Sequence, residues 1–197
     1  MRPERILLPL DVRECPLEMF SVVEGCARRP GVTVILLHVI HLNIVALESR
    51  VYEELALEAR WYLERLAKRY LPPSTSTLFH VRIGKPVEQI LGEAKSEEVQ
   101  LILLPTYGPS FWRRAASVLK PGSCRMVSPS VERIIRDASC GVFVTNVKTR
   151  FDCEKEWGPA PRETSQEVAS SWSGFAVASF GERDGQNAAL CDPTGSV

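Results

Sequence analysis

The sequence lacks any apolar run long enough to cross a lipid bilayer. Its longest run, residues 32–40, is interrupted by Thr33 and His38 and falls far short of the roughly 20 residues that a membrane-spanning helix needs. Residues 1–5 lead into only five apolar residues, too few for the core of a signal peptide. We therefore expect a cytoplasmic protein with no membrane partner.

An excess of charge of one sign is also missing. The 24 Lys and Arg residues balance 24 Asp and Glu residues, so we expect no long-range attraction to nucleic acid. Six cysteines are present, but no two form a Cys-x-x-Cys pair, and His38 and His41 have no nearby Cys or Asp that would complete a metal set. We expect free thiols and no zinc site.

Several enzyme motifs are absent. The turn after the first predicted strand, Asp11 to Cys15, has no Gly-x-Gly-x-x-Gly, and neither a P-loop nor a Gly-x-Ser-x-Gly elbow occurs. A receiver domain needs an Asp after its third strand, where residues 83–85 read Ile-Gly-Lys. A Cys15 near a helix start could be reactive, but a buried, inert thiol is the favoured interpretation. We expect no enzyme, with weak ATP hydrolysis left open.

The residues that are present alternate between two hydrophobic periods. Short apolar runs predict buried strands, and segments with apolar residues three and four apart predict helices. Pro9 is awkward inside a central strand, so we place it near the end of the first strand. The predicted strands span residues 5–10, 32–40, 76–83, 99–104 and 141–147, with helices near 19–27, 48–70, 87–94 and 129–138.

Strict alternation of strand and helix predicts an α/β fold. We expect a doubly wound three-layer α/β/α sandwich around a five-stranded parallel sheet in the order 3-2-1-4-5. Ligands in such folds bind beyond the carboxyl ends of the strands at the switch point between strands 1 and 4. This domain covers residues 1–147. Residues 148–197 lose the periodicity and predict a disordered or loosely docked tail.

The chain from about residue 4 to residue 147 resembles the universal stress protein family. The resemblance rests on the order and spacing of several short pieces and covers about three quarters of the chain. The pieces are residues 6–11 (ILLPLD), 37–39 (LHV), 81–86 (VRIGKP), 101–108 (LILLPTYG), 131–135 (VERII) and 138–144 (ASCGVFV).

This resemblance implies a homodimeric cytoplasmic protein linked to stress survival. One branch of the family binds ATP and another does not. In the binding branch, the acidic residue after the first strand, here Asp11, faces the adenosine, and the backbone at the end of the second strand, here Val39, contacts adenine. The phosphates lie on a Gly-x2-Gly-x9-Gly-[Ser/Thr] loop, where glycines let backbone N–H groups approach phosphate oxygens.

This sequence departs from the loop pattern. Pro105 takes the first glycine position and Gly108 keeps the second, but nine residues further lie Val118 and Leu119. A Gly122-Ser123 pair lies four residues beyond the position that the pattern requires. Alignment through the next helix places Ser128-Pro129 there instead, and a proline has no N–H to donate.

The same loop is basic. No acidic residue occurs between positions 99 and 131, whereas Arg113, Arg114, Lys120 and Arg125 do. Arginine grips phosphate with paired N–H donors, although a solvated basic loop explains the pattern equally well. Phe111 and Trp112 could stack a base or pack the loop onto the domain.

Two hypotheses of different class remain open. The first is an adenine-nucleotide-binding stress-response module that takes ATP or AMP with Mg²⁺. The second is a homodimeric protein-interaction module that binds no nucleotide. Both allow dimerisation through the fifth strand, Gly141 to Val147, whose edge is free to pair. The nucleotide site of the first hypothesis consists of Asp11, Val39, Gly108, Arg113, Gly122, Ser123 and Ser128.

Overall fold

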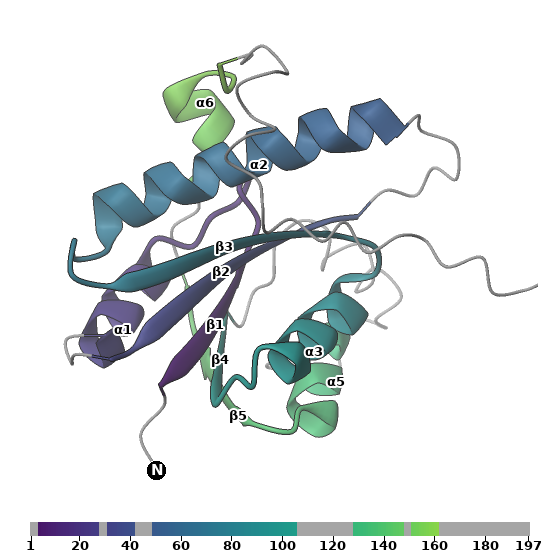
Figure 1. The fold of residues 1–197 in the computed structure, drawn as a ribbon. Helices are drawn as coiled ribbons and strands as arrows, with labels where there is room; N and C mark the ends of the chain where they lie inside the picture. Colours follow the sequence, from purple (N-terminus) through teal and green to yellow (C-terminus); the bar gives the residue numbers. More distant parts are fainter. Residues whose placement is uncertain (1–3, 28–30, 42–48, 106–127, 148–150, 162–197) are drawn as a thin grey trace, which may run out of the picture. The chain divides into compact units, whose positions relative to one another are not determined.

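Strands and helices alternate along the chain as the sequence predicts. The computed structural model describes residues 4–27, 31–41, 49–105, 128–147 and 151–161. Figure 1 shows the path of the chain. The elements are β1 (Arg5–Leu10), α1 (Glu18–Ala27), β2 (Thr33–Ile40), α2 (Ser49–Tyr70), β3 (Ser76–Ile83), α3 (Pro86–Ser96), β4 (Leu101–Pro105), α5 (Pro129–Asp137), β5 (Gly141–Thr145) and α6 (Cys153–Trp157).

The five strands form one parallel sheet in the order β3-β2-β1-β4-β5. The predicted fold class and strand order are therefore confirmed. β1 pairs with β2 from Arg5↔Thr33 to Leu10↔His38. β1 lies at the centre of the sheet, and β3 and β5 lie at its two edges.

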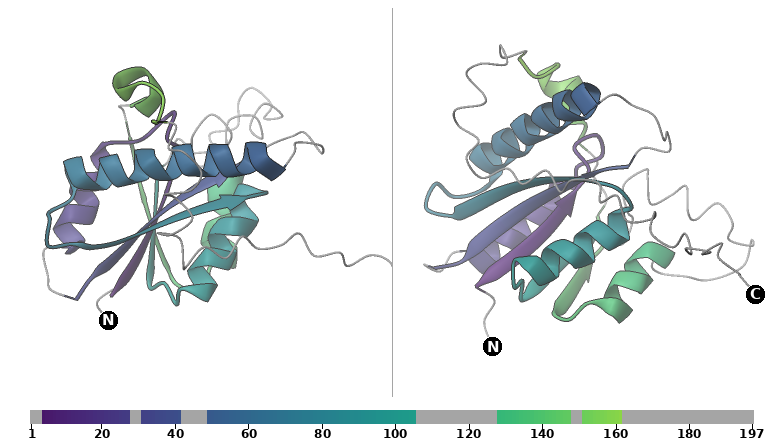
Figure 2. Two further views of the ribbon diagram at one scale, coloured as in Figure 1. Left: turned by 45° about the horizontal axis from the view of Figure 1, so that its top comes forward. Right: turned by 45° about the vertical axis from the view of Figure 1, so that its right-hand side comes forward.

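Helices cover both faces of the sheet, as Figure 2 shows from two directions. Successive strand residues point to opposite faces, so Ile6 and Leu8 join one hydrophobic cluster with α1 and α2, and Leu7 joins another with α3 and α5. All three of these side chains are fully buried. Burial on both faces explains why the strand reads as a continuous apolar run.

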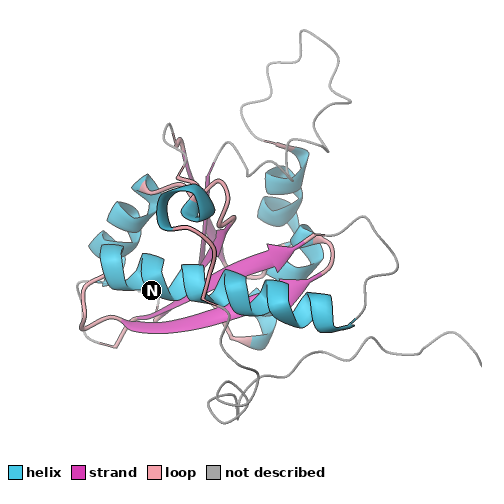
Figure 3. Cartoon of the chain, turned by 90° about the horizontal axis from the view of Figure 1, so that it is seen from above, coloured by secondary structure: helices cyan, strands magenta, loops and turns pink. Residues whose placement is uncertain are grey.

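The long helix α2 lies along the sheet face that Figure 3 views from above. Its buried stripe includes Tyr62, Leu63 and Leu66, and its remaining surface is largely charged. This two-sided pattern is typical of a helix that packs by one stripe alone. None of the described helices is long and apolar enough to span a membrane.

The described chain continues to pack on the domain past residue 147, where the sequence analysis ends it. Phe151 forms an antiparallel bridge with Cys15, and Cys153, at the start of α6, is fully buried in the cluster under α1 and α2. The hydroxyl of Tyr62 on α2 donates to the carbonyl of Gly158 at 2.9 Å. The first compact unit therefore runs to Pro161, and residues 162–197 lie outside the described part.

We predict that Leu36→Ala, in the middle of β2, lowers the free energy of unfolding by about 2–5 kcal/mol, because a fully buried leucine leaves a cavity. Leu78→Ala, on the edge strand β3 where the side chain is 37% exposed, should cost about 1 kcal/mol or less. Urea unfolding followed by circular dichroism measures both. Equal costs would contradict the layered packing.

Candidate functional site

Pro9 ends the pairing between β1 and β4. The carbonyl of Arg5 accepts from the Gln100 N–H at 3.1 Å, so the backbone of Arg5 faces β4. Alternate residues of a strand share that direction, so Pro9, four residues further, also faces β4. It has no N–H to offer there. The registered pairs between the strands stop at Leu7↔Ile102, and the carboxyl ends of β1 and β4 are left unpaired at the switch point of the sheet.

Asp11 follows directly on β1 at this switch point. Asp11 is only 7% exposed. Its Oδ1 accepts a hydrogen bond from the backbone N–H of Arg13 at 3.0 Å. Its carbonyl accepts from the N–H of Glu14 at 3.1 Å. A tight turn thus fixes an acidic side chain at the place where ligands bind in such sheets.

Val39 places a backbone carbonyl beside the same edge. The neighbouring Ile40 carbonyl accepts from the Gly84 N–H at 3.1 Å, so it faces β3. Successive carbonyls of a strand point to opposite neighbours, so the Val39 carbonyl faces the β1 side. The registered pairs of β1 and β2 end at Leu10↔His38, one residue earlier. The valine side chain itself is buried, with 4% exposed, so only its backbone can serve a ligand.

His38 lies between these two positions. Its Nδ1 is 3.0 Å from the carbonyl of Leu10, to which an Nδ1–H donates. Burial lowers the pKa of His38, although the negative charge of Asp11 and the hydrogen bond to Leu10 act in the opposite direction. At neutral pH the ring is therefore uncharged.

Ser128 uses its hydroxyl to cap a helix. Its Oγ accepts from the N–H of Val131 at 3.3 Å, and Pro129 occupies the first turn of α5. The first turn of this helix therefore lacks one N–H donor and has another already engaged. The remaining predicted loop residues, Gly108, Arg113, Gly122 and Ser123, lie outside the described residues.

The loop after Asp11 is held by a segment that the sequence analysis assigns to the tail. Cys15 and Phe151 exchange two backbone hydrogen bonds of 2.7 and 2.9 Å, and the N–H of Cys153 donates to the carbonyl of Val12 at 3.0 Å. One signal for this helix exists in the sequence. Asp152 caps the start of α6, where its side chain accepts a hydrogen bond from the Lys155 N–H. A glycine directly after Trp157 is a signal for the end of a helix.

Cys15 is fully buried in this loop. Burial raises the pKa of its thiol well above the ordinary value, and nearby Cys153 and Asp11 raise it further. Because the thiolate is the nucleophilic form, the structure agrees with the inert thiol that the sequence favours.

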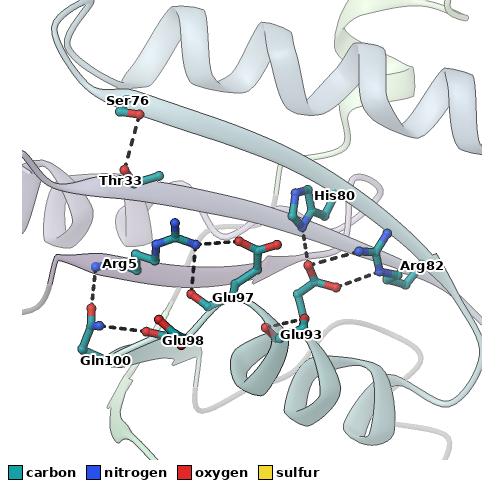
Figure 4. A network of polar contacts seen from close by, with 10 residues as sticks. Arg5, Thr33, Ser76, His80, Arg82, Glu93, Glu97, Glu98 and Gln100 are labelled. Atoms are coloured by element: carbon teal, nitrogen blue, oxygen red, sulfur yellow. Dashed lines mark hydrogen bonds and ion pairs between the residues drawn. The ribbon is translucent and has the colours of Figure 1, made fainter. Parts of the chain in front are cut away.

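A second polar cluster lies between the sheet and α3 (Figure 4). His80, Glu93 and Glu97 each offer one ligand atom, and these atoms lie within 4.8 Å of one another. Two arginines already hold the carboxylates: Arg82 Nε is 2.7 Å from Glu93 Oε2, and Arg5 Nη1 is 2.7 Å from Glu97 Oε2. His80 also bonds to Glu93. The protein thus compensates both negative charges itself, and we interpret the cluster as a structural network rather than a metal centre.

This network controls the ionisation of Glu93. Burial by itself would raise the pKa of this carboxyl, but the hydrogen bond from His80 and the charge of Arg82 outweigh burial, so the pKa is lowered. His80 and Arg82 are two residues apart on β3 and so share one face of the sheet. They join the edge strand to α3.

We predict that Glu93→Gln lowers the free energy of unfolding at pH 7 by about 1.5–3 kcal/mol, because the Arg82 guanidinium and the His80 ring lose an ionised acceptor on a residue that is only 3% exposed. Glu97→Gln is the matched control. Its side chain is 26% exposed, so its loss should cost about 1 kcal/mol or less.

The same variant has a defined pH dependence. A carboxyl whose pKa is lowered by folding stabilises the protein above its unfolded pKa of about 4.3. That contribution is lost as the pH falls through the lower folded value. The difference in stability between the wild type and Glu93→Gln should therefore shrink on acidification. A difference that stays constant from pH 7 to pH 3 in chemical unfolding would contradict this account of the network.

Comparisons with known proteins agree with the geometry. The profile of the universal stress protein family matches residues 3–146. A hypothetical protein solved as a test case for structure-based assignment of function aligns with a TM-score of 0.58 and 24% identity, covering 75% of this chain and 99% of that one. No curated protein matches the chain.

Two further solved structures carry the family name. The universal stress protein UspA from Lactobacillus plantarum aligns with a TM-score of 0.53 and 19% identity, covering 73% of this chain and 97% of that one. A universal stress protein in complex with cAMP aligns with a TM-score of 0.51 and 12% identity, covering 75% of this chain and 100% of that one. At such identities the likeness concerns the fold, whereas the profile spans most of the chain. The chain belongs to the universal stress protein family.

Proposed function

We propose that this protein is a stress-response or regulatory module that binds an adenine nucleotide, ATP or AMP, at the switch point between β1 and β4. The observation that carries the proposal is the end of β1. Pro9 stops the pairing with β4, and Asp11 is fixed directly after it by its bond from Arg13. A structural relative in complex with cAMP supports an adenine ligand for this fold.

The described edge favours recognition of the adenosine part. Asp11 provides a fixed carboxylate acceptor, suited to hydroxyl donors, and the carbonyl of Val39 provides a second acceptor beyond the end of β1. The start of α5 offers less to phosphate, because Pro129 has no N–H and the Ser128 hydroxyl is engaged as a cap. In this proposal, contacts to the adenosine contribute more to the binding affinity than contacts to the phosphates.

The chemistry of the edge fits binding better than catalysis. Among its described titratable groups, His38 has a lowered pKa and the buried thiol of Cys15 has a raised pKa. We propose a cytoplasmic setting as well, because the four cysteines of the described residues are free thiols, as a reducing compartment maintains them.

We predict that AMP and ATP bind the full chain with micromolar dissociation constants, measured by isothermal titration with and without Mg²⁺. Asp11→Asn should weaken AMP binding by about tenfold or more, because a neutral amide loses a charge-assisted bond to the ligand. The amide oxygen can still accept from Arg13 N–H, so the turn should survive. Asp137→Asn, an aspartate at the far end of α5 that pairs with Arg133 and Arg136, is the matched control.

Thermal unfolding of the variants shows whether the fold is kept. Absence of heat with wild-type protein at millimolar AMP, or an unchanged affinity in a folded Asp11→Asn variant, would refute the nucleotide proposal. Phosphate release from ATP, measured in the same samples, would reveal the weak hydrolysis that the sequence leaves open.

The second candidate function is a homodimeric interaction module that binds no nucleotide. One observation favours pairing through β5: Phe143 on this edge strand and Ile135 on the adjoining helix α5 are each 46% exposed. Large apolar side chains on a sheet edge invite a second edge. The proposed dimer therefore joins two copies of β5, and it is compatible with the nucleotide site at the centre of the sheet.

We predict that the wild type sediments as a dimer and that Phe143→Asp shifts it to a monomer, because a charge would be buried at the centre of the interface. Leu78→Asp is the matched control on the opposite edge strand, β3, and should leave the dimer intact. A monomeric wild type, or dissociation caused by Leu78→Asp alone, would rule out the β5 interface.

A further inference from the structure

A groove lies between the C-terminal half of α2 and the short helix α6. It has a volume of about 390 Å³ and is lined by Trp61, Arg65, Lys68, Arg69 and Trp157. Four of these residues come from α2 and one from α6. We call this surface the α2–α6 groove.

The three cations of the groove have no carboxylate partner among the described residues. Arg65, Lys68 and Arg69 are exposed and take part in no ion pair or hydrogen bond there. Other cations of the same helix form ion pairs. Arg60 Nε is 2.9 Å from Glu64 Oε1, and Arg50 Nε is 3.5 Å from Glu54 Oε1. Three neighbouring positive charges without compensation favour a bound anion.

Arg65 is held in place by two indole rings. Its guanidinium carbon lies 4.7 Å from the centre of the Trp61 ring and 5.0 Å from that of Trp157. An aromatic ring supplies no acceptor oxygen, so this contact leaves the guanidinium N–H donors available. Because the rings restrict the side chain before any ligand arrives, less conformational entropy is lost on binding.

Trp157 is itself fixed by the packing of the C-terminal segment. Its ring centre is 5.1 Å from that of Phe151, and α6 is anchored through the buried Cys153 and through the Tyr62–Gly158 hydrogen bond. The negative end of a helix dipole accounts for cations such as Lys68 and Arg69 in the last turn of α2. The helix dipole does not account for the contact between Arg65 and Trp157. Trp157 lies outside residues 3–146, the range that matches the family.

We propose that the α2–α6 groove is a second binding site that takes an oligophosphate, either free or as the phosphate chain of a nucleotide. One phosphate group carries a charge of at most about −2, so three cations match a chain of two or three phosphates better than a single one. Arginine donors suit phosphate oxygens in pairs. The volume of about 390 Å³ lies in the range of small-ligand sites.

The test separates this site from the adenine site through the choice of ligand. Tripolyphosphate has no adenosine, and the part of its binding in isothermal titration that depends on Arg65 and Arg69 reports the groove. AMP has a single phosphate and reports the switch point. We expect tripolyphosphate to bind the full chain, to bind more weakly as salt rises, and to be unaffected by saturating AMP. Absence of tripolyphosphate binding at low salt overturns the proposal.

The variants address specificity. The double variant Arg65→Gln with Arg69→Gln should weaken tripolyphosphate binding about tenfold or more, and Trp157→Phe should weaken it less, by loosening Arg65. The control is Arg50→Gln with Arg136→Gln, which removes the same charge from exposed ion pairs elsewhere. An equal loss in the control would show unspecific attraction and overturn the proposal. Circular dichroism confirms that each variant is folded.

The source of the phosphate chain follows from competition. If ATP displaces tripolyphosphate and the Arg65/Arg69 double variant abolishes that competition, a nucleoside triphosphate is a ligand of the groove. If ATP binds without displacing tripolyphosphate, the groove takes free oligophosphate. Both results support the site, whereas displacement by AMP as effective as by ATP would contradict recognition of a phosphate chain.

Discussion

The backbone hydrogen bond that Pro9 is unable to make shapes the carboxyl edge of the sheet. A central strand of a parallel sheet normally pairs along its whole length on both sides, yet β1 pairs with β2 through Leu10 and with β4 only through Leu7. The proline ends the ladder on one side without interrupting the other. The strand can therefore remain fully buried in the core while its last residues separate from β4, and Asp11 follows at the point of separation.

Much of the fold could be predicted from the sequence, because its determinants are local and repeated. Burial on both faces gives β1 and β2 their continuous apolar runs, and the residues that end helices or begin them, such as Pro86 and Pro129, act within one turn. The strand order follows from the alternation of elements and from the handedness of their connections. None of these requires knowledge of which distant side chains meet.

The candidate site could be predicted only in part, because it depends on contacts between residues that are distant in the sequence. The rule that carboxyl ends of strands gather at one edge points to the loop that begins at Asp11, whereas Val39 is implied only by the resemblance to the universal stress protein family. The effect of Pro9 on β4 depends on which neighbour its missing N–H faces, and that direction becomes visible only once the register is known. The antiparallel bridge between Cys15 and Phe151 joins residues from opposite ends of the domain. A helix of five residues such as α6 is also too short to show a hydrophobic period.

That bridge also bears on the order in which the domain folds. β1 and its following loop are synthesised before the rest of the domain, but the loop forms hydrogen bonds with Phe151 and Cys153, which are synthesised near the end of the domain. Contacts between such distant positions form late, because a long chain must close first. A nascent chain that already has all five strands still exposes the loop beside Asp11, so the candidate site is completed only when the last described segment docks.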